Sequence, residues 1–332
     1  MALDFLNENL FNTPPQPALW VSLPLPNDPC AGYWTELLGS SPNTNPAELL
    51  RSQYIQLSFP IQAGISLTPE YLAAVRKGIP PQLVKPYTAP FTGKLTVYLH
   101  PTPAGSIPVI ETASAEDFSL LLQTLAYKNE PREIPASMGA AFISGLINWR
   151  RVALLQQDGM PFSDFKNQPQ LYQDNLLLLS NKGYSGVAVA GENEEAWNQH
   201  SLAIRLGHES SHYMTRRFYG SAKNAVHDEI IADCMGLIKA YGYYRPELFL
   251  LFMGLEDFPR FRKGGRLENY LSNLTLTEAE FEVLCRTVID AALNIKELCA
   301  SSPATPEERF RLFEVLCRTT VNNMAEGKFF RF

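Results

Sequence analysis

The sequence predicts an α+β protein with a mixed α/β N-terminal domain, a central core that contains a helix pair, and a mostly helical C-terminal region. Two observations predict this division. Of the 25 prolines, 19 precede residue 136, in short runs that are typical of strands and loops. Beyond that point, long apolar patterns at helical spacing take over. We expect domains at 1–135, 136–250 and 251–332.

Composition limits the classes of protein to consider. The 332 residues are 45% hydrophobic and 11% aromatic, which suffices for a large folded core. The net charge of -6 argues against nucleic acid as a partner, because phosphate binding needs a positive field. No apolar run approaches the roughly 18 residues needed to cross a bilayer, and the first residues are acidic rather than basic. We therefore expect a cytoplasmic protein without a membrane partner.

The N-terminal domain shows both strand and helix patterns. Residues 54–61 and 94–100 carry β-branched and aromatic side chains at strand spacing. Residues 69–77 and 114–126 have helical spacing, and Ser114 is placed to cap the second helix. These patterns predict two strands and two helices.

The predicted core begins with a helical pattern that runs from Ala136 through AAFISGLINWRRVALL, residues 140–155, and is followed by a buried strand at 174–180. Glycines punctuate the segment after this strand. If the strand lay at an edge of the sheet, it could bind an extended peptide through main-chain hydrogen bonds. Residues 174–190 are the candidate for such an edge.

A helix pair follows. The first helix is predicted to begin near Glu194 or Trp197 and to end at Gly220, a suitable C-cap. Ser221 or Asn224 can then cap a second helix that runs to about residue 243. Beyond residue 246 the chain is predicted to be mostly helical.

Two further features favour packing roles. The five cysteines form no CxxC pair, so we expect buried free thiols rather than disulfides or a thiolate zinc site. The heptapeptide FEVLCRT occurs at 281–287 and again at 313–319. Two copies fall short of the three or more units that a repeat architecture requires, which favours two similar packing helices.

The first helix of the pair contains an HExxH motif, His208-Glu209-Ser210-Ser211-His212. Residues i and i+4 share one helical face, so both imidazoles can bind one ion. Glu209 lies about 100° around the helix and can take a proton from a zinc-bound water, whose pKa the metal lowers to about 7.

The second helix offers two carboxylates on one face, Glu229 and Asp233. If the chain reverses at Gly220, His212 and Glu229 lie eight and nine residues from the bend, about 12 to 14 Å along their helices. This places Glu229 at the metal as third ligand. Asp233 is then expected beside His208, as the acceptor for the second ring nitrogen. A fourth position remains for water, as in catalytic zinc sites.

These residues resemble the gluzincins, the thermolysin-like zinc metallopeptidases. In that group HExxH on one helix is followed by a glutamate on the next and by an aspartate four residues later, and the pattern covers about 26 residues of this chain, 208–233. The resemblance implies a zincin-like core with zinc bound by His208, His212 and Glu229, and peptide hydrolysis with Glu209 as general base.

Gluzincins also use side chains that stabilise the oxyanion of the transition state, and no motif marks them here. The candidates follow or belong to the ligand helix: Tyr241, Tyr243, Tyr244, Arg245 and His227. Each has an alternative role, because aromatic residues at these positions also pack, and His227 lies about 200° from Glu229 on the helix. A basic cluster, Arg260, Arg262, Lys263 and Arg266, could bind an acidic group of a substrate, but a solvated loop is favoured.

The sequence therefore predicts a cytoplasmic zinc metallohydrolase that acts on a peptide or protein substrate. The alternative is a catalytically silent zincin-like protein that uses the metal to hold its helices and works through binding. A third interpretation, an accidental HExxH without metal, also stays open. Imidazole and carboxylate also suit manganese, iron and cobalt. The sequence carries no signal for an oligomeric state.

Overall fold

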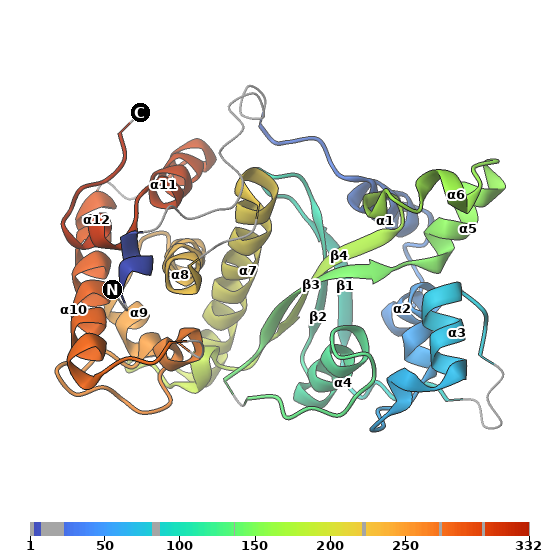
Figure 1. Ribbon diagram of the computed structural model, residues 1–332, viewed down its shortest axis with the longest axis horizontal. Coiled ribbons are helices and arrows are strands. Elements are labelled where there is room, and N and C mark those ends of the chain that lie inside the picture. The colour runs from blue at the N-terminus through green and yellow to red at the C-terminus, as the bar shows by residue number, and fades with distance from the viewer. Residues whose placement is uncertain are drawn as a thin grey trace. The chain divides into compact units, whose positions relative to one another are not determined.

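The computed structural model describes residues 3–7, 23–81, 87–135, 137–220, 224–271, 274–300 and 303–331. Its helices and its sheet form an α+β fold, which confirms the predicted class (Figure 1). The chain divides into two compact units, residues 24–182 and residues 1–23 with 183–332. The predicted domain limits at 135 and 250 thus lie inside these units rather than between them.

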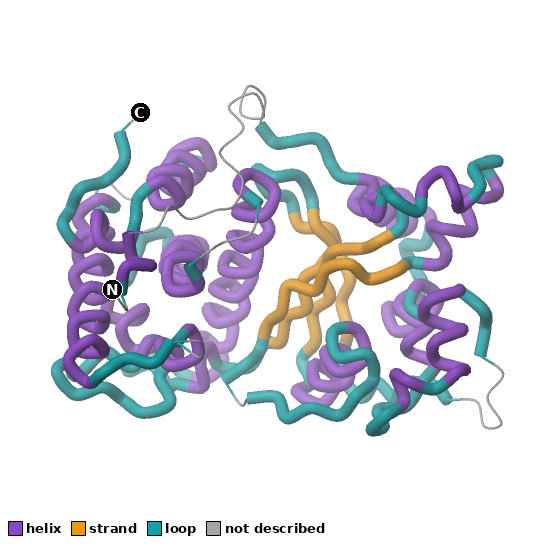
Figure 2. Tube along the Cα trace, viewed as in Figure 1, coloured by secondary structure: helices purple, strands orange, loops and turns teal. Residues whose placement is uncertain are grey.

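A four-stranded mixed sheet organises the unit of residues 24–182 (Figure 2). Its strands are β1 (Leu95–His100), β2 (Ile107–Thr112), β3 (Ala140–Ile147) and β4 (Gln173–Ser180), in the order β1-β2-β4-β3. β2 and β4 are parallel, whereas the other two pairs are antiparallel. β4 was predicted as a buried strand, and its four leucines, 176–179, are fully buried. Because it pairs on both sides, it offers no free edge to a peptide, and that expectation was wrong.

Along the chain, helices precede the first strand of this sheet and lie between its later strands. They are α1 (Pro29–Ser40), α2 (Pro46–Gln53), η3 (Ile55–Ser58), η4 (Ile65–Leu67), α3 (Pro69–Lys77), α4 (Ala115–Leu125), α5 (Trp149–Gln157), α6 (Phe162–Phe165) and η5 (Pro169–Leu171). α3 and α4 confirm two predicted helices, and Ser114 accepts the predicted capping hydrogen bond from the Asp117 amide. Proline opens α1, α2 and α3 at a first-turn position, where its missing N–H costs no hydrogen bond. The proline-rich half is thus more helical than expected.

Two predicted elements of this unit were wrong. The expected strand at 54–61 is instead the short 3₁₀ helix η3, since the amides of Leu57 and Phe59 close turns onto the carbonyls of Tyr54 and Gln56. The expected helix at 140–155 is strand β3 followed by helix α5, separated by Asn148, which caps α5. The apolar run of β3 pairs with β4, so tertiary pairing overrode local periodicity.

Helices dominate the second unit. Its elements are η1 (Asp4–Asn7), η6 (Tyr184–Gly186), α7 (Glu194–Tyr219), α8 (Ala225–Tyr241), α9 (Pro246–Met253), η7 (Arg266–Tyr270), α10 (Glu278–Leu298), α11 (Pro306–Arg318) and α12 (Val321–Ala325). Gly220 caps the end of α7, and Asn224 caps the start of α8 through its side chain. Ser221, the other predicted cap, lies outside the described residues. In the ranges described, no helix is long and apolar enough to span a membrane.

The cysteines match their expected role. All five are buried and none forms a disulfide: Cys30, Cys234, Cys285, Cys299 and Cys317. Burial raises the pKa of the Cys234 thiol well above its ordinary value, and the neighbouring Cys299 thiol raises it further. The Cys234 thiol is therefore a protonated packing group.

α7 and α8 are antiparallel and touch backbone to backbone at two glycines. A Cβ atom on Gly207 would lie 2.8 Å from the Cα of Gly236, and a Cβ on Gly236 would lie 2.7 Å from the carbonyl oxygen of Ile204. Only glycine permits this approach, because real Cβ atoms do not come so close to backbone. Gly207 immediately precedes His208, and Gly236 follows Asp233 by three residues. The close contact of the helices at these glycines therefore sets the distance between the side chains of His208 and Asp233.

Gly236→Ala is therefore expected to push the helices apart. The added methyl group must displace the α7 backbone, which we expect to lower the free energy of unfolding by about 1–3 kcal/mol. Urea unfolding measures the change. Gly32→Ala in α1 is the control, since a Cβ there meets nothing within 4 Å, and a stabilisation of about 0.5–1 kcal/mol is expected. Equal effects of the two substitutions would contradict the close approach.

Candidate metal centre

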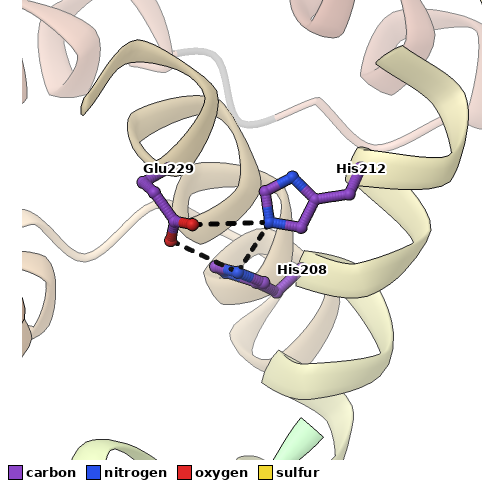
Figure 3. Close-up of side chains that lie close together, drawn as sticks. All are labelled: His208, His212 and Glu229. Carbon is purple, nitrogen blue, oxygen red and sulfur yellow. Dashed lines mark hydrogen bonds and ion pairs between the residues drawn. The ribbon is translucent and has the colours of Figure 1, made fainter. Parts of the chain in front are cut away.

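Two imidazoles and one carboxylate converge where α7 and α8 face each other (Figure 3). The Nε2 atoms of His208 and His212 are 3.0 Å apart. The carboxylate of Glu229 lies 3.4 Å from the first and 3.6 Å from the second. The structure thus brings together the three side chains expected to share one ion, as the distances along the two helices predicted.

Each imidazole is held from behind by an aspartate. Nδ1 of His208 lies 2.8 Å from Oδ1 of Asp233, the partner that the sequence predicted. Nδ1 of His212 lies 2.9 Å from Oδ2 of Asp228, a partner that the sequence analysis missed. A carboxylate accepts the Nδ1 proton, which fixes the tautomer and leaves the Nε2 lone pair directed away from it. Both lone pairs therefore point into the cluster.

This arrangement requires a positive charge at its centre. Two Nε2 atoms 3.0 Å apart that both present a lone pair, with a carboxylate beside them, repel one another unless a proton or a metal ion lies between them. In the metal-free chain a proton meets the need: burial lowers the pKa of His212, but Asp228, Glu229 and Glu209 together raise it to about 10. The site is electrostatically suited to a cation.

The donor set fits zinc. Ligands bound at 2.0–2.1 Å and tetrahedral angles are about 3.3 Å apart, close to the three distances in the cluster. Four carboxylates, at Glu209, Asp228, Glu229 and Asp233, outweigh two guanidiniums, that of Arg266, which pairs with two of them, and that of Arg205, which acts on Glu209. A divalent ion would therefore reduce the excess negative charge. The side chains of His212 and Glu229 keep 18% and 16% of their surface exposed, which gives an ion access from solvent.

Glu209 lies beside the three converging side chains without joining them. It follows His208 on α7, is 8% exposed, and is close enough to His212 to raise the pKa of that imidazole. Its carboxylate accepts no hydrogen bond from the residues that the structure describes. The Arg205 guanidinium acts on this carboxylate electrostatically. A carboxylate beside a cation site, without a hydrogen-bond donor among the described residues, is suited to exchanging protons.

Three polar residues that were not predicted to lie at this site complete the cluster: Tyr184, Arg266 and Tyr270. Arg266 donates from Nη2 to Glu229 (2.7 Å) and from Nη1 to Asp233 (3.1 Å). The hydroxyl of Tyr270 donates to Glu229 at 2.9 Å. The hydroxyl of Tyr184 donates to Asp233 at 2.6 Å. Burial would raise the pKa of Asp233, but Arg266 and the hydrogen bonds from His208 and Tyr184 hold it below the ordinary value.

The position of Arg266 corrects the prediction for the basic cluster. Arg260 is 87% exposed, as expected of a solvated loop, but the Arg266 side chain is 12% exposed and pairs with two carboxylates. One sequence signal was available, because Arg266 and Tyr270 are spaced by four and their side chains meet at 2.9 Å. Nothing in the sequence indicated the helix that they face.

Three of the five expected oxyanion donors, Tyr241, Arg245 and His227, make other polar contacts. The Tyr241 hydroxyl donates to Glu192, and Arg245 pairs with Glu247. His227 is buried, with Nε2 2.9 Å from the Leu316 carbonyl oxygen, consistent with its rotation away from Glu229. Tyr243 is 50% exposed. Tyr244 is buried, with a hydroxyl that has no partner among the described residues.

Asp228→Asn tests the support behind His212. The amide keeps the shape of the side chain but removes the charge that orients and polarises the imidazole, so zinc affinity is expected to fall by about 10-fold to 100-fold. Competition with a chromophoric chelator measures it. Asp257→Asn is the matched control, because Asp257 is 75% exposed. A zinc affinity of Asp228→Asn as high as that of the unmodified protein would show that Asp228 does not support metal binding.

Comparison with known proteins places the chain in a family. The model of the "Family of unknown function (DUF7005)" matches residues 2–328, and the chain belongs to this family. No curated protein and no solved structure matches it.

Proposed function

We propose that this chain is a zinc-dependent metallohydrolase that cleaves peptide bonds. One observation carries the proposal: two Nε2 lone pairs and the Glu229 carboxylate meet within 3.6 Å, and each imidazole is held by an aspartate. Three protein ligands with a position left for water are typical of catalytic zinc, whereas structural zinc has four protein ligands. The resemblance of 208–233 to the gluzincins favours peptides as the substrate class.

The residues of the chain divide the chemistry among them. His208, His212 and Glu229 would hold the zinc, which supplies a Lewis acid for the substrate carbonyl and lowers the pKa of a water to about 7. Glu209 takes the proton of the attacking water and returns it to the leaving amine, as a general base and then a general acid. Asp228 and Asp233 keep the imidazoles in the tautomer that presents Nε2.

A peptide library tests this function. The purified protein is incubated with mixed peptides, and the products are identified by mass spectrometry before and after chelation and after zinc is returned. We expect cleavage that chelation abolishes and zinc restores. A protein that binds zinc but cleaves nothing across broad libraries would contradict the hydrolase and support the silent, binding form.

A further inference from the structure

Arg266 and Tyr270 converge on a single oxygen of Glu229. Both lie on η7, more than 35 residues along the chain from Glu229. Arg266 Nη2 and the Tyr270 hydroxyl lie 2.7 and 2.9 Å from Oε2 of Glu229. Arg266 Nε also donates to the Tyr270 hydroxyl at 2.9 Å, which orients the tyrosine proton toward the carboxylate.

These contacts make the two oxygens of the Glu229 carboxylate different in their hydrogen bonding. An ionised carboxylate offers about four lone-pair sites, two on each oxygen. The two donors take both sites on Oε2, although this oxygen lies 3.4 Å from His208 Nε2. Oε1 accepts no hydrogen bond from the described part of the chain, and it lies 3.6 Å from His212 Nε2. Glu229 thus has one oxygen available to a cation.

The donors are themselves held in place. Arg266 Nη1 donates to Asp233 and to the Tyr184 hydroxyl, and its guanidinium lies 5.2 Å from the centre of the Tyr184 ring. The guanidinium therefore links two carboxylates. One is that of Glu229, which would ligate the ion, and the other is that of Asp233, which orients His208. A planar group whose donors point in fixed directions restrains both carboxylates in one geometry, whereas the donors of a lysine ammonium rotate.

We propose that Arg266 and Tyr270 set the coordination number of the bound metal by restricting Glu229 to one ligating oxygen. This inference rests on the proposed zinc site and assigns two positioning residues to it. With one oxygen from Glu229 and two imidazole nitrogens, water completes a four-coordinate ion. Such a site favours zinc or cobalt, whereas manganese prefers more oxygen ligands and higher coordination.

Cobalt substitution provides a direct test, since the visible bands of four-coordinate Co²⁺ are more intense than those of five-coordinate Co²⁺. The unmodified protein is expected to show the intense bands. Tyr270→Phe removes one donor and leaves the ring, so Oε2 becomes available and the bands are expected to weaken. The ratio of Zn²⁺ to Mn²⁺ affinity is expected to fall by about 10-fold to 100-fold in the same variant.

Arg266→Met removes the other donor and is expected to act in the same direction. Because it also leaves two carboxylates without their cation, Tyr270→Phe remains the decisive variant if this protein does not fold. Arg260→Met in the exposed part of the same loop is the matched control and should keep the spectrum and the affinity ratio.

The outcomes separate the two proposals. A five-coordinate spectrum in the unmodified protein, or an unchanged spectrum and ratio in Tyr270→Phe, would overturn the role of these residues while leaving the metal site intact. Failure of the unmodified protein to bind either Zn²⁺ or Co²⁺ would instead overturn the proposed function, and the inference with it.

Discussion

Glu209→Gln is expected to lower kcat/KM for a cleaved peptide by about 10²-fold to 10⁴-fold, with zinc retained at about one ion per chain. The amide has almost the same shape as the carboxylate but cannot accept a proton. His208, His212 and Glu229 are unchanged, so metal binding should persist. Peptide kinetics and elemental analysis of the same sample give both values.

Glu195→Gln is the matched control for this substitution, since Glu195 lies exposed in the first turn of the same helix. It should change neither value. If Glu209→Gln kept full turnover, Glu209 would have no part in the mechanism. If it lost zinc together with turnover, its role would be in binding the metal rather than in moving a proton.

Glu229→Gln is expected to weaken zinc binding by more than about 100-fold, beyond the 10-fold to 100-fold typical of residues that only support a ligand. The substitution replaces an anionic ligand with a neutral amide and leaves Arg266 with Asp233 as its remaining carboxylate partner. His208→Ala should have a comparable effect, because it removes an imidazole ligand outright. Competition with a chelator of known affinity measures both variants.

Glu278→Gln, at an exposed position in the first turn of α10, controls for the loss of one negative charge from the chain. Zinc affinity in this variant should equal that of the unmodified protein. Equal affinity in Glu229→Gln would mean that the carboxylate 3.4 and 3.6 Å from the two imidazoles does not ligate the ion.

The meeting of the two helices could be predicted from the sequence because helices are rigid and regular. A rise of about 1.5 Å per residue converts a count from Gly220 into a position, so His212 faces Glu229 and His208 faces Asp233 once the chain reverses. Caps at Gly220 and Asn224 marked the ends of both helices. The glycines that bring them into contact, Gly207 and Gly236, carried no such signal in the sequence.

The supporting residues could not be predicted in this way. Tyr184, Arg266 and Tyr270 lie on short 3₁₀ segments, where no long periodic pattern fixes a direction. Arg266 and the exposed Arg260 belong to the same basic cluster, and the burial of Arg266 depends on tertiary surroundings that local sequence does not encode. Asp228 adjoins Glu229, but its contact with His212 depends on the crossing of the helices.

The two copies of the heptapeptide FEVLCRT also have different tertiary surroundings. The first copy lies in α10, and the second lies in α11 with its last residue as the C-cap. Val283 is 54% exposed in the first copy, whereas Val315 is buried in the second. The same side chain therefore packs in one helix and contacts solvent in the other. This difference favours two separate packing helices over a repeated unit.

Elemental analysis of the protein purified without added metal is the most direct test of the central claim. If α7 and α8 form a zinc site, about one zinc ion should accompany each chain, and Glu229→Gln prepared in parallel should carry far less. A chain that contains no divalent metal, and that takes up none when zinc is supplied, would contradict the account and leave the HExxH motif as a coincidence of sequence.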